Sequence, residues 1–80
     1  MTAEGKVSRF LLDLAKRYEM AGPIDLQVSR REIADYLGLS VELVSRVLSR
    51  FAEARYITIP NVREVEIIDA EALEAIAETD

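Results

Sequence analysis

Residues 29–40, with the sequence SRREIADYLGLS, constrain the fold more than any other stretch of the chain. Ser29 and Glu32 match a capping box, in which a serine and a glutamate three residues later each satisfy a free backbone donor at a helix start. Gly38 can end that helix in a left-handed conformation without steric cost. Ser40 is the next N-cap candidate. The stretch therefore predicts two helices joined by a very short turn.

The second of these helices, predicted from Val41 to about Ala54, has two distinct faces. A rotation of about 100° per residue separates the side chains into an apolar set and a polar set. The apolar set is Val44, Val47, Leu48 and Phe51, and the polar set is Glu42, Ser45, Arg46 and Ser49. The apolar face predicts packing on a core, whereas the polar face is either plain surface or the functional part.

One helix and one strand are predicted before this pair of helices. Phe10, Leu11, Leu14 and Tyr18 recur at helical spacing, which predicts a first helix over roughly residues 4–19. Ile24, Leu26 and Val28 alternate with Asp25 and Gln27, a period typical of a half-buried strand. We expect this strand at the edge of a small sheet.

A β-hairpin and a last helix are predicted after the pair. Residues 56–59 and 65–68 are the predicted strands, and Pro60-Asn61 supplies turn chemistry between them. Asp69 can cap a final helix in which Ala72, Leu73 and Ile76 recur at helical spacing.

This order of elements predicts an α+β fold, the winged helix-turn-helix. It would have a three-helix core, a small antiparallel β-sheet that forms the wing, and a short C-terminal helix. The helix-turn-helix would span about residues 29–54 and the wing about residues 56–68. In this fold the second helix of the pair enters the major groove of DNA.

Length and composition limit the kind of protein. At 80 residues the chain is expected to form a single domain, residues 1–80, around one small core. It contains no cysteine and no histidine, which removes thiol and imidazole catalysis and zinc sites built from these residues. We therefore expect no enzyme, no cofactor and no metal. Apolar runs are short and the N-terminus lacks a secretory signal, so we expect no membrane insertion and a cytoplasmic location.

Taken alone, the net charge of −5 argues weakly against a nucleic-acid partner. The distribution of charge along the chain changes that interpretation. Residues 64–80 hold seven acids and no base, whereas residues 29–63 hold six arginines against four acids. The middle of the chain, which contains the predicted helix-turn-helix, is therefore mildly basic.

The polar residues near the start of the second helix are candidates for reading bases, because the first turns of such a helix reach base edges. Arg46 can bind guanine O6 and N7 together, Glu42 can accept from cytosine N4, and Ser45 can serve several partners. The alternative is that Glu42 and Arg46, one helical turn apart, form an ordinary surface pair worth about 0.2–0.5 kcal/mol. Ser49 is interpreted as surface.

Other polar side chains are candidates for contacts with DNA phosphates. Ser29, Arg30 and Arg31 lie where the first helix of the pair begins, so free backbone donors and two arginines can meet phosphates there. Arg50 lies one turn beyond Arg46, and Arg63 lies in the predicted hairpin tip. For Arg50 and Arg63 the alternative of a solubilising surface arginine stays open.

Together these residues resemble a known family. The stretch from Val28 to Phe51, in which IADYLGLS is followed by VExxSR, resembles the C-terminal DNA-binding domain of the Crp/Fnr family of bacterial transcription regulators. Val-Glu-x-x-Ser-Arg is similar to the Fnr and FixK branch. The resemblance implies a palindromic operator with TTGAT-like half-sites. It also implies base reading by Glu42, Ser45 and Arg46, and phosphate contacts from Ser29, Arg30, Arg31 and Ser40.

The sequence departs from the family pattern in three ways. Leu43 stands where the family usually has a threonine that can touch phosphate. Arg55 stands where a glycine normally ends the recognition helix, so either Arg55 adopts a costly left-handed conformation or the helix ends differently. The sensor domain and dimerisation helix of full regulators are absent. We therefore expect a fragment that is monomeric alone, although the full-length regulator would be a homodimer.

Two functional hypotheses follow. The first is sequence-specific binding of double-stranded DNA as the output domain of a transcription regulator, and the resemblance admits RNA polymerase as a further partner. The alternative is a winged-helix module for protein–protein interaction without specific DNA binding, which the net charge permits.

Overall fold

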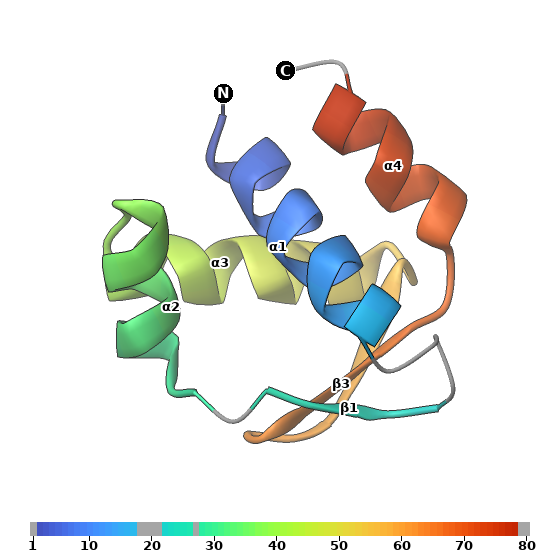
Figure 1. Ribbon diagram of the computed structural model, residues 1–80, viewed down its shortest axis with the longest axis horizontal. Helices are drawn as coiled ribbons and strands as arrows, with labels where there is room; N and C mark the ends of the chain where they lie inside the picture. Colours follow the sequence, from blue (N-terminus) through green and yellow to red (C-terminus); the bar gives the residue numbers. More distant parts are fainter. Residues whose placement is uncertain (1, 18–21, 27, 79–80) are drawn as a thin grey trace.

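The structure is a computed structural model that describes residues 2–17, 22–26 and 28–78. The described elements are, in order, α1 (Ala3–Arg17), β1 (Ile24–Asp25), α2 (Arg30–Leu37), α3 (Val41–Glu53), β2 (Ile57–Asn61), β3 (Glu64–Ile67) and α4 (Ala70–Glu78). Figure 1 shows α1 crossing α3, α4 lying beside α1, and the strands together along one side of the helices. The predicted winged helix-turn-helix is confirmed, with α2 and α3 as the helix pair and the β2–β3 hairpin as the wing.

The sheet is antiparallel, with the strand order β1-β3-β2. The first strand lies at the edge, as predicted, and its Ile24 pairs with Val65 of β3. Among the described residues of this segment, only 24 and 25 pair with β3, so the described strand is shorter than the alternation over residues 24–28 suggested. Gln27 lies outside the described residues.

The turn of the wing lies two residues later than predicted. Pro60 and Asn61 belong to β2, and the turn is formed by Val62 and Arg63. Thr58 pairs with Glu66 and Asn61 with Glu64, so β2 holds one extra residue between these pairs. Proline cannot donate to a strand ladder, but an irregularity on an edge strand tolerates it. Pro60 therefore interrupts the pairing without ending the strand.

The hydrophobic core is formed mainly by α1, α3, the sheet and α4. Its buried members include Val7, Leu11, Leu12, Ile33, Val44, Val47, Leu48, Phe51, Ile57, Val65 and Leu73. The apolar face predicted for α3 is confirmed in full. The face predicted for α1 was only partly right, because Leu11 is buried while Phe10 and Leu14 are half-buried. Tyr18 lies outside the described residues. The face of α1 is displaced because this helix packs against both α3 and α4, and so buries Val7, Leu12 and Ala15.

The two helices of the helix-turn-helix end with the same backbone geometry. Gly38 has φ 73°, and the N–H of the following Leu39 donates to the Ala34 carbonyl at 2.8 Å. After α3, Arg55 has φ 65°, and the N–H of Tyr56 donates to the Phe51 carbonyl at 2.9 Å. Of the two alternatives for the end of α3, the left-handed arginine is therefore the one observed. Asp69 caps α4, as predicted, by accepting from the N–H of Ala72 at 3.1 Å.

Candidate nucleic-acid interface

The starts of α2 and α3 are fixed by side chains that the sequence identifies. The Ser29 hydroxyl accepts from the N–H of Glu32 at 3.2 Å, and the Glu32 carboxylate accepts from the N–H of Ser29 at 3.1 Å. Ser40 caps α3 by accepting from the N–H of Leu43 at 3.1 Å. Both predicted caps are confirmed, so each of the two helices begins at a defined residue.

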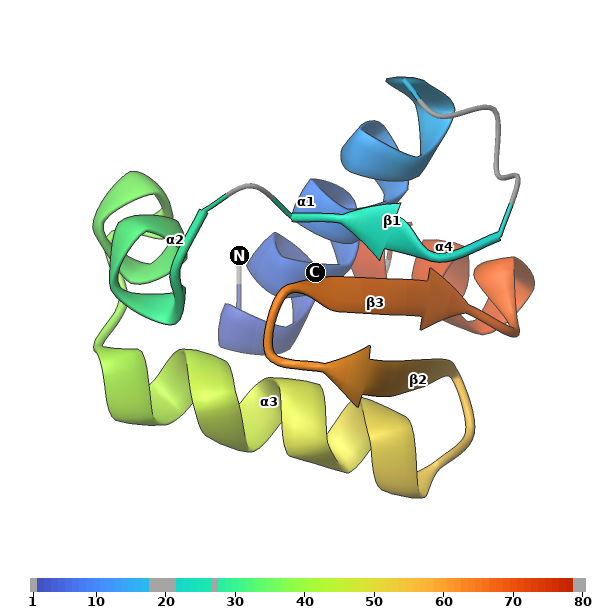
Figure 2. The same cartoon turned by 90° about the horizontal axis from the view of Figure 1, so that it is seen from below.

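The third helix buries one face and leaves the opposite face uncovered. In Figure 2 it runs along the edge of the molecule, and both α2, near its start, and β2, nearer its end, lie on the same side of it. Glu42, Arg46 and Ser49 are exposed, and Ser45 is half-buried. Val44, Val47 and Leu48 on the other face are each 2% exposed or less. The three predicted base readers thus lie in the first two turns of a helix that the core anchors firmly.

The surface pair considered as an alternative for Glu42 and Arg46 is not formed. Among the residues that the structure describes, the ion pairs are Arg9–Asp13, Arg50–Glu4 and Arg63–Asp25, and neither Glu42 nor Arg46 takes part in one. Both side chains project from the helix without a partner in the described part of the chain. They are therefore available to an external ligand.

The predicted phosphate contacts fall into two groups. Ser29 and Arg31 are exposed at the start of α2, and Ser40 is exposed at the start of α3. Each of the two serine oxygens already accepts from a backbone N–H, so each hydroxyl hydrogen can still be donated to a phosphate oxygen. Ser29 and Arg31 thus present donors at the start of α2, and Ser40 presents one at the start of α3.

The other three arginines have partners within the domain. Arg50 lies 4.0 Å from Glu4 of α1, and Arg63 lies 3.9 Å from Asp25 of β1. All four side chains are at least 46% exposed, so these pairs are weak. Arg30 donates from Nη1 to the Val62 carbonyl in the wing at 3.3 Å, and burial lowers the pKa of its guanidinium. No sequence pattern predicts this contact, because Arg30 and Val62 are 32 residues apart.

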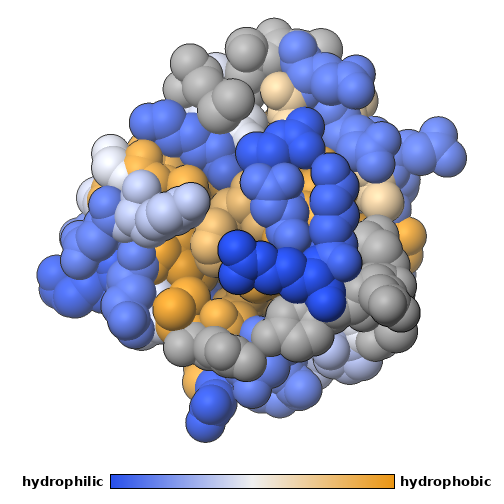
Figure 3. Space-filling view, viewed as in Figure 1, coloured by the Kyte–Doolittle hydropathy of each residue, from blue (hydrophilic) through white to orange (hydrophobic). Residues whose placement is uncertain are grey.

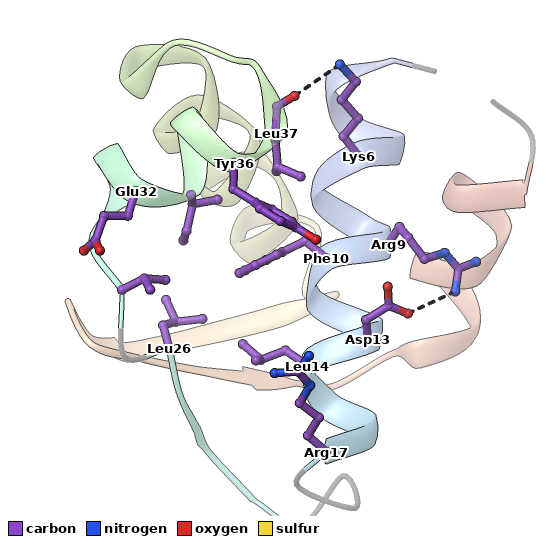
Figure 4. A pocket seen from close by; sticks show the side chains of 12 residues that line it. Lys6, Arg9, Phe10, Asp13, Leu14, Arg17, Leu26, Glu32, Tyr36 and Leu37 are labelled. Carbon is purple, nitrogen blue, oxygen red and sulfur yellow. Dashed lines mark hydrogen bonds and ion pairs between the residues drawn. The ribbon is translucent and has the colours of Figure 1, made fainter.

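A groove of about 690 Å³ lies between α1 and α2, away from the exposed face of α3. Figure 4 shows the Tyr36 ring above that of Phe10, with the Arg9–Asp13 pair and the contact between Lys6 and the Leu37 carbonyl around it. Apolar side chains gather in this region of the surface, with hydrophilic ones around them (Figure 3). No residue of α3 lines this groove, so it is separate from the predicted base-reading face.

Within the described residues, no group of three or more acidic side chains could hold a metal ion. None of the described helices combines the length and the apolar character needed to span a membrane.

Comparison with known proteins identifies the family. Residues 5–76 match the family described as the Crp-like helix-turn-helix domain. The chain belongs to this family. Its Crp-like helix-turn-helix is therefore a DNA-binding domain of the kind found in Crp/Fnr transcription regulators, as its residues suggested.

Several curated relatives are regulators of the Fnr and FixK type. The chain is 38% identical over 71 residues to the nitrogen fixation regulation protein FixK of Rhizobium meliloti, an alignment that covers 89% of this chain and 34% of that protein. It is 42% identical over 80 residues to the transcriptional regulatory protein btr of Bordetella pertussis, covering 95% of this chain and 33% of that protein. The chain thus spans about a third of the length of these relatives. Their names are those of regulators, which supports the expectation that this Crp-like domain is not an enzyme.

Solved structures agree with the fold. FixK2 from Bradyrhizobium japonicum superposes with a TM-score of 0.89 at 36% identity, over 94% of this chain and 38% of that chain. The CO-dependent transcription factor CooA from Carboxydothermus hydrogenoformans superposes with a TM-score of 0.83 at 23% identity, over 94% of this chain and 36% of that chain. The CooA match supports the fold alone.

Proposed function

We propose that this Crp-like domain reads TTGAT-like half-sites in the major groove with Glu42, Ser45 and Arg46. The observation that carries the proposal is the absence of a partner for Glu42 and Arg46 in the described part of the chain, on the uncovered amino-terminal turns of α3. An arginine there can donate to two acceptors of one guanine, and a glutamate can accept from a cytosine amino group. No rearrangement within the domain is needed to release either side chain.

Contacts to the DNA backbone would hold α3 in register over the bases. We assign them to Ser29, Arg30 and Arg31 at the start of α2, to Ser40 at the start of α3, and to Arg50 and Arg63. Such contacts give affinity without sequence preference. They also make binding depend strongly on salt, because each neutralised phosphate releases bound counterions.

Two copies of the domain would bind a palindromic operator, with their recognition helices about 34–36 Å apart in successive major grooves. The isolated chain is expected to be a monomer, because its large exposed apolar side chains, Tyr36, Val62 and Ile68, come from three different parts of the described fold. Dimerisation and contacts with RNA polymerase would belong to the full-length regulator, which we propose to act in the cytoplasm. Sedimentation of the 80-residue chain as a dimer at micromolar concentration would contradict the first point.

The experiment that tests the function compares two fluorescent duplexes, one with an inverted repeat of TTGAT and one with the same bases scrambled. Binding is measured at about 50 mM and about 150 mM salt, where phosphate-mediated affinity falls steeply. We expect the inverted repeat to bind more tightly at both concentrations. Equal affinity for the two duplexes, with the free domain and with a version joined to a dimerising helix, would overturn specific reading. That result would favour a protein-interaction module.

A further inference from the structure

The tip of the wing is tied to the segment that leads into α2. The N–H of Leu26 donates to the Arg63 carbonyl at 2.8 Å, and Nη1 of Arg30 donates to the Val62 carbonyl at 3.3 Å. Both carbonyls of the two-residue turn are therefore engaged by residues that precede the recognition helix. Figure 2 shows the loop between β2 and β3 lying close to the start of α2.

The turn is also stiffened from within. The Asn61 side chain accepts from the N–H of Arg63 at 2.9 Å and donates to the Glu64 carboxylate at 2.8 Å. Asparagine at this place in a turn mimics a backbone turn and fixes the two residues after it. The tip is thus a preformed unit whose position depends on what holds it to the rest of the domain.

Within the described helix-turn-helix, Arg30 supplies the side chain that hydrogen-bonds to this tip. A small hollow between the two is lined by Val28, Ser29, Arg30, Val62 and Arg63. Arg30 is half-buried there, whereas its neighbour Arg31 is exposed and has no hydrogen bond or ion pair among the described residues. The two adjacent arginines are therefore placed for different roles.

We propose that Arg30 is a positioning residue for the wing. Its hydrogen bond to the Val62 carbonyl sets where Arg63 meets the DNA backbone, so Arg30 contributes to DNA binding through Arg63 rather than mainly through a phosphate of its own. Arg31, which is free, contacts a phosphate directly. This inference rests on the proposed function and refines the equal treatment that Arg30 and Arg31 receive there.

Arg63 is suited to be the residue of the wing that contacts the DNA backbone. Its side chain is 74% exposed, and its 3.9 Å pair with Asp25 is weak enough to exchange for a phosphate. If the tip moves, the guanidinium moves with it, and a loosely held arginine loses more conformational entropy on binding. Loss of the hydrogen bond from Arg30 should therefore remove most of the contribution of Arg63 to DNA affinity.

A double-mutant cycle on DNA affinity tests the coupling, with the inverted-repeat duplex as the probe. The proteins are the unmodified chain, Arg30→Ala, Arg63→Ala and the double variant. We expect each single change to weaken binding by about three- to tenfold and to reduce the slope of log affinity against log salt by about 0.9, the value of one phosphate contact. The double variant should bind within about twofold of the weaker single variant, since coupled residues are not additive.

The matched control is a second double-mutant cycle, in which Arg31→Ala takes the place of Arg30→Ala. Arg31→Ala and Arg63→Ala should multiply in their effects, because an independent phosphate contact does not act through the wing. Multiplicative losses for Arg30→Ala and Arg63→Ala as well would overturn the positioning role and leave Arg30 as an ordinary phosphate contact.

A second measurement needs no DNA. The amide hydrogen of Leu26 is bonded to the Arg63 carbonyl, so its exchange with solvent reports how firmly the tip is held. We expect exchange at Leu26 to be at least about tenfold faster in Arg30→Ala and unchanged in Arg31→Ala, with the amides of α3 unaffected in both. Unchanged exchange in Arg30→Ala would overturn the inference even if the domain binds DNA. A different outcome is that exchange at Leu26 is faster in Arg30→Ala, as expected, but neither the unmodified chain nor any variant binds DNA. That result would refute the proposed function and with it any role of Arg30 in DNA binding.

Discussion

The backbone of Arg46 is held in α3, whereas its guanidinium has no partner among the described residues. Substitution of Arg46 therefore tests base reading directly. Arg46→Ala removes no ion pair of the described structure, so the stability of the domain should change by less than about 0.5 kcal/mol. Binding to the inverted repeat should weaken by roughly 1–3 kcal/mol and lose preference at one base pair. Affinities for duplexes changed at single positions measure this. A uniform loss on all duplexes would instead make Arg46 a phosphate contact.

Ser8, unlike the exposed Arg46, is a polar residue whose side chain is buried. It is 0% exposed in α1, and its hydroxyl has no hydrogen-bond partner among the residues that the structure describes. An unpaired buried hydroxyl costs about 1–3 kcal/mol, and alanine is also the better helix former. Ser8→Ala should therefore raise the free energy of unfolding by about 1 kcal/mol in urea titrations. Ser49→Ala on the exposed face of α3 is the control, and an equal gain there would show that helix propensity alone is responsible.

The base-reading residues could be predicted from the sequence because their placement is local. Glu42, Ser45 and Arg46 follow a serine cap, and helical spacing alone places them away from Val44 and Val47. The role of Arg30 could not be predicted in the same way. Its partner is a backbone carbonyl 32 residues away, and no spacing rule connects a helix start to a hairpin tip.

The end of α3 shows how an element can tolerate an unfavourable residue. Arg55 adopts φ 65°, the only positive φ among the described non-glycine residues. The closing hydrogen bonds and the 5.9 Å contact between the rings of Phe51 and Tyr56 hold it there. Gly38 ends α2 with the same geometry at no such cost.

Arg55→Gly should accordingly stabilise the domain by about 1 kcal/mol, since a left-handed non-glycine residue costs roughly 1–2 kcal/mol, part of which is offset by the greater freedom of glycine in the unfolded chain. Arg55→Ala, which keeps a Cβ atom, should give no such gain. Urea denaturation of the three proteins provides the comparison. Stabilisation by alanine as large as that by glycine would mean that the charge of Arg55, rather than its backbone, is unfavourable.

Elements defined by caps were predicted well, and elements defined by tertiary packing less well. The starts of α2, α3 and α4 follow from Ser29, Ser40 and Asp69, each of which accepts from a backbone N–H of its own helix. The wing turn was misplaced, because whether a proline ends a strand depends on whether that strand lies at an edge. The buried face of α1 was displaced for a similar reason, since its sequence cannot show that α4 packs against it.

On the scale of the whole molecule, charge is unevenly placed. Glu71, Glu74 and Glu78 are exposed on α4, which packs against α1 on the side of the domain away from α2 (Figure 1). The proposed contacts with DNA come from α2, α3 and the wing. The net charge of −5 is therefore weighted toward α4, and the field of the domain would turn the less acidic side toward DNA while repelling DNA from the far side.

Neutralising the acidic side chains of α4 separates the effect of the long-range field from that of the direct contacts with DNA. The triple variant Glu71→Gln, Glu74→Gln and Glu78→Gln changes the net charge from −5 to −2 without touching the proposed contacts. The domain measures 28 × 27 × 23 Å, so charges on α4 act over a large part of its width. The Debye length is about 30 Å at 0.01 M salt but only about 8 Å at 0.15 M. We expect affinity to rise several-fold at the lower salt and by less than about twofold at the higher, equally for the inverted-repeat and scrambled duplexes. A gain that persists at 0.15 M, or one confined to the inverted repeat, would place α4 in direct contact with DNA and contradict the assigned interface.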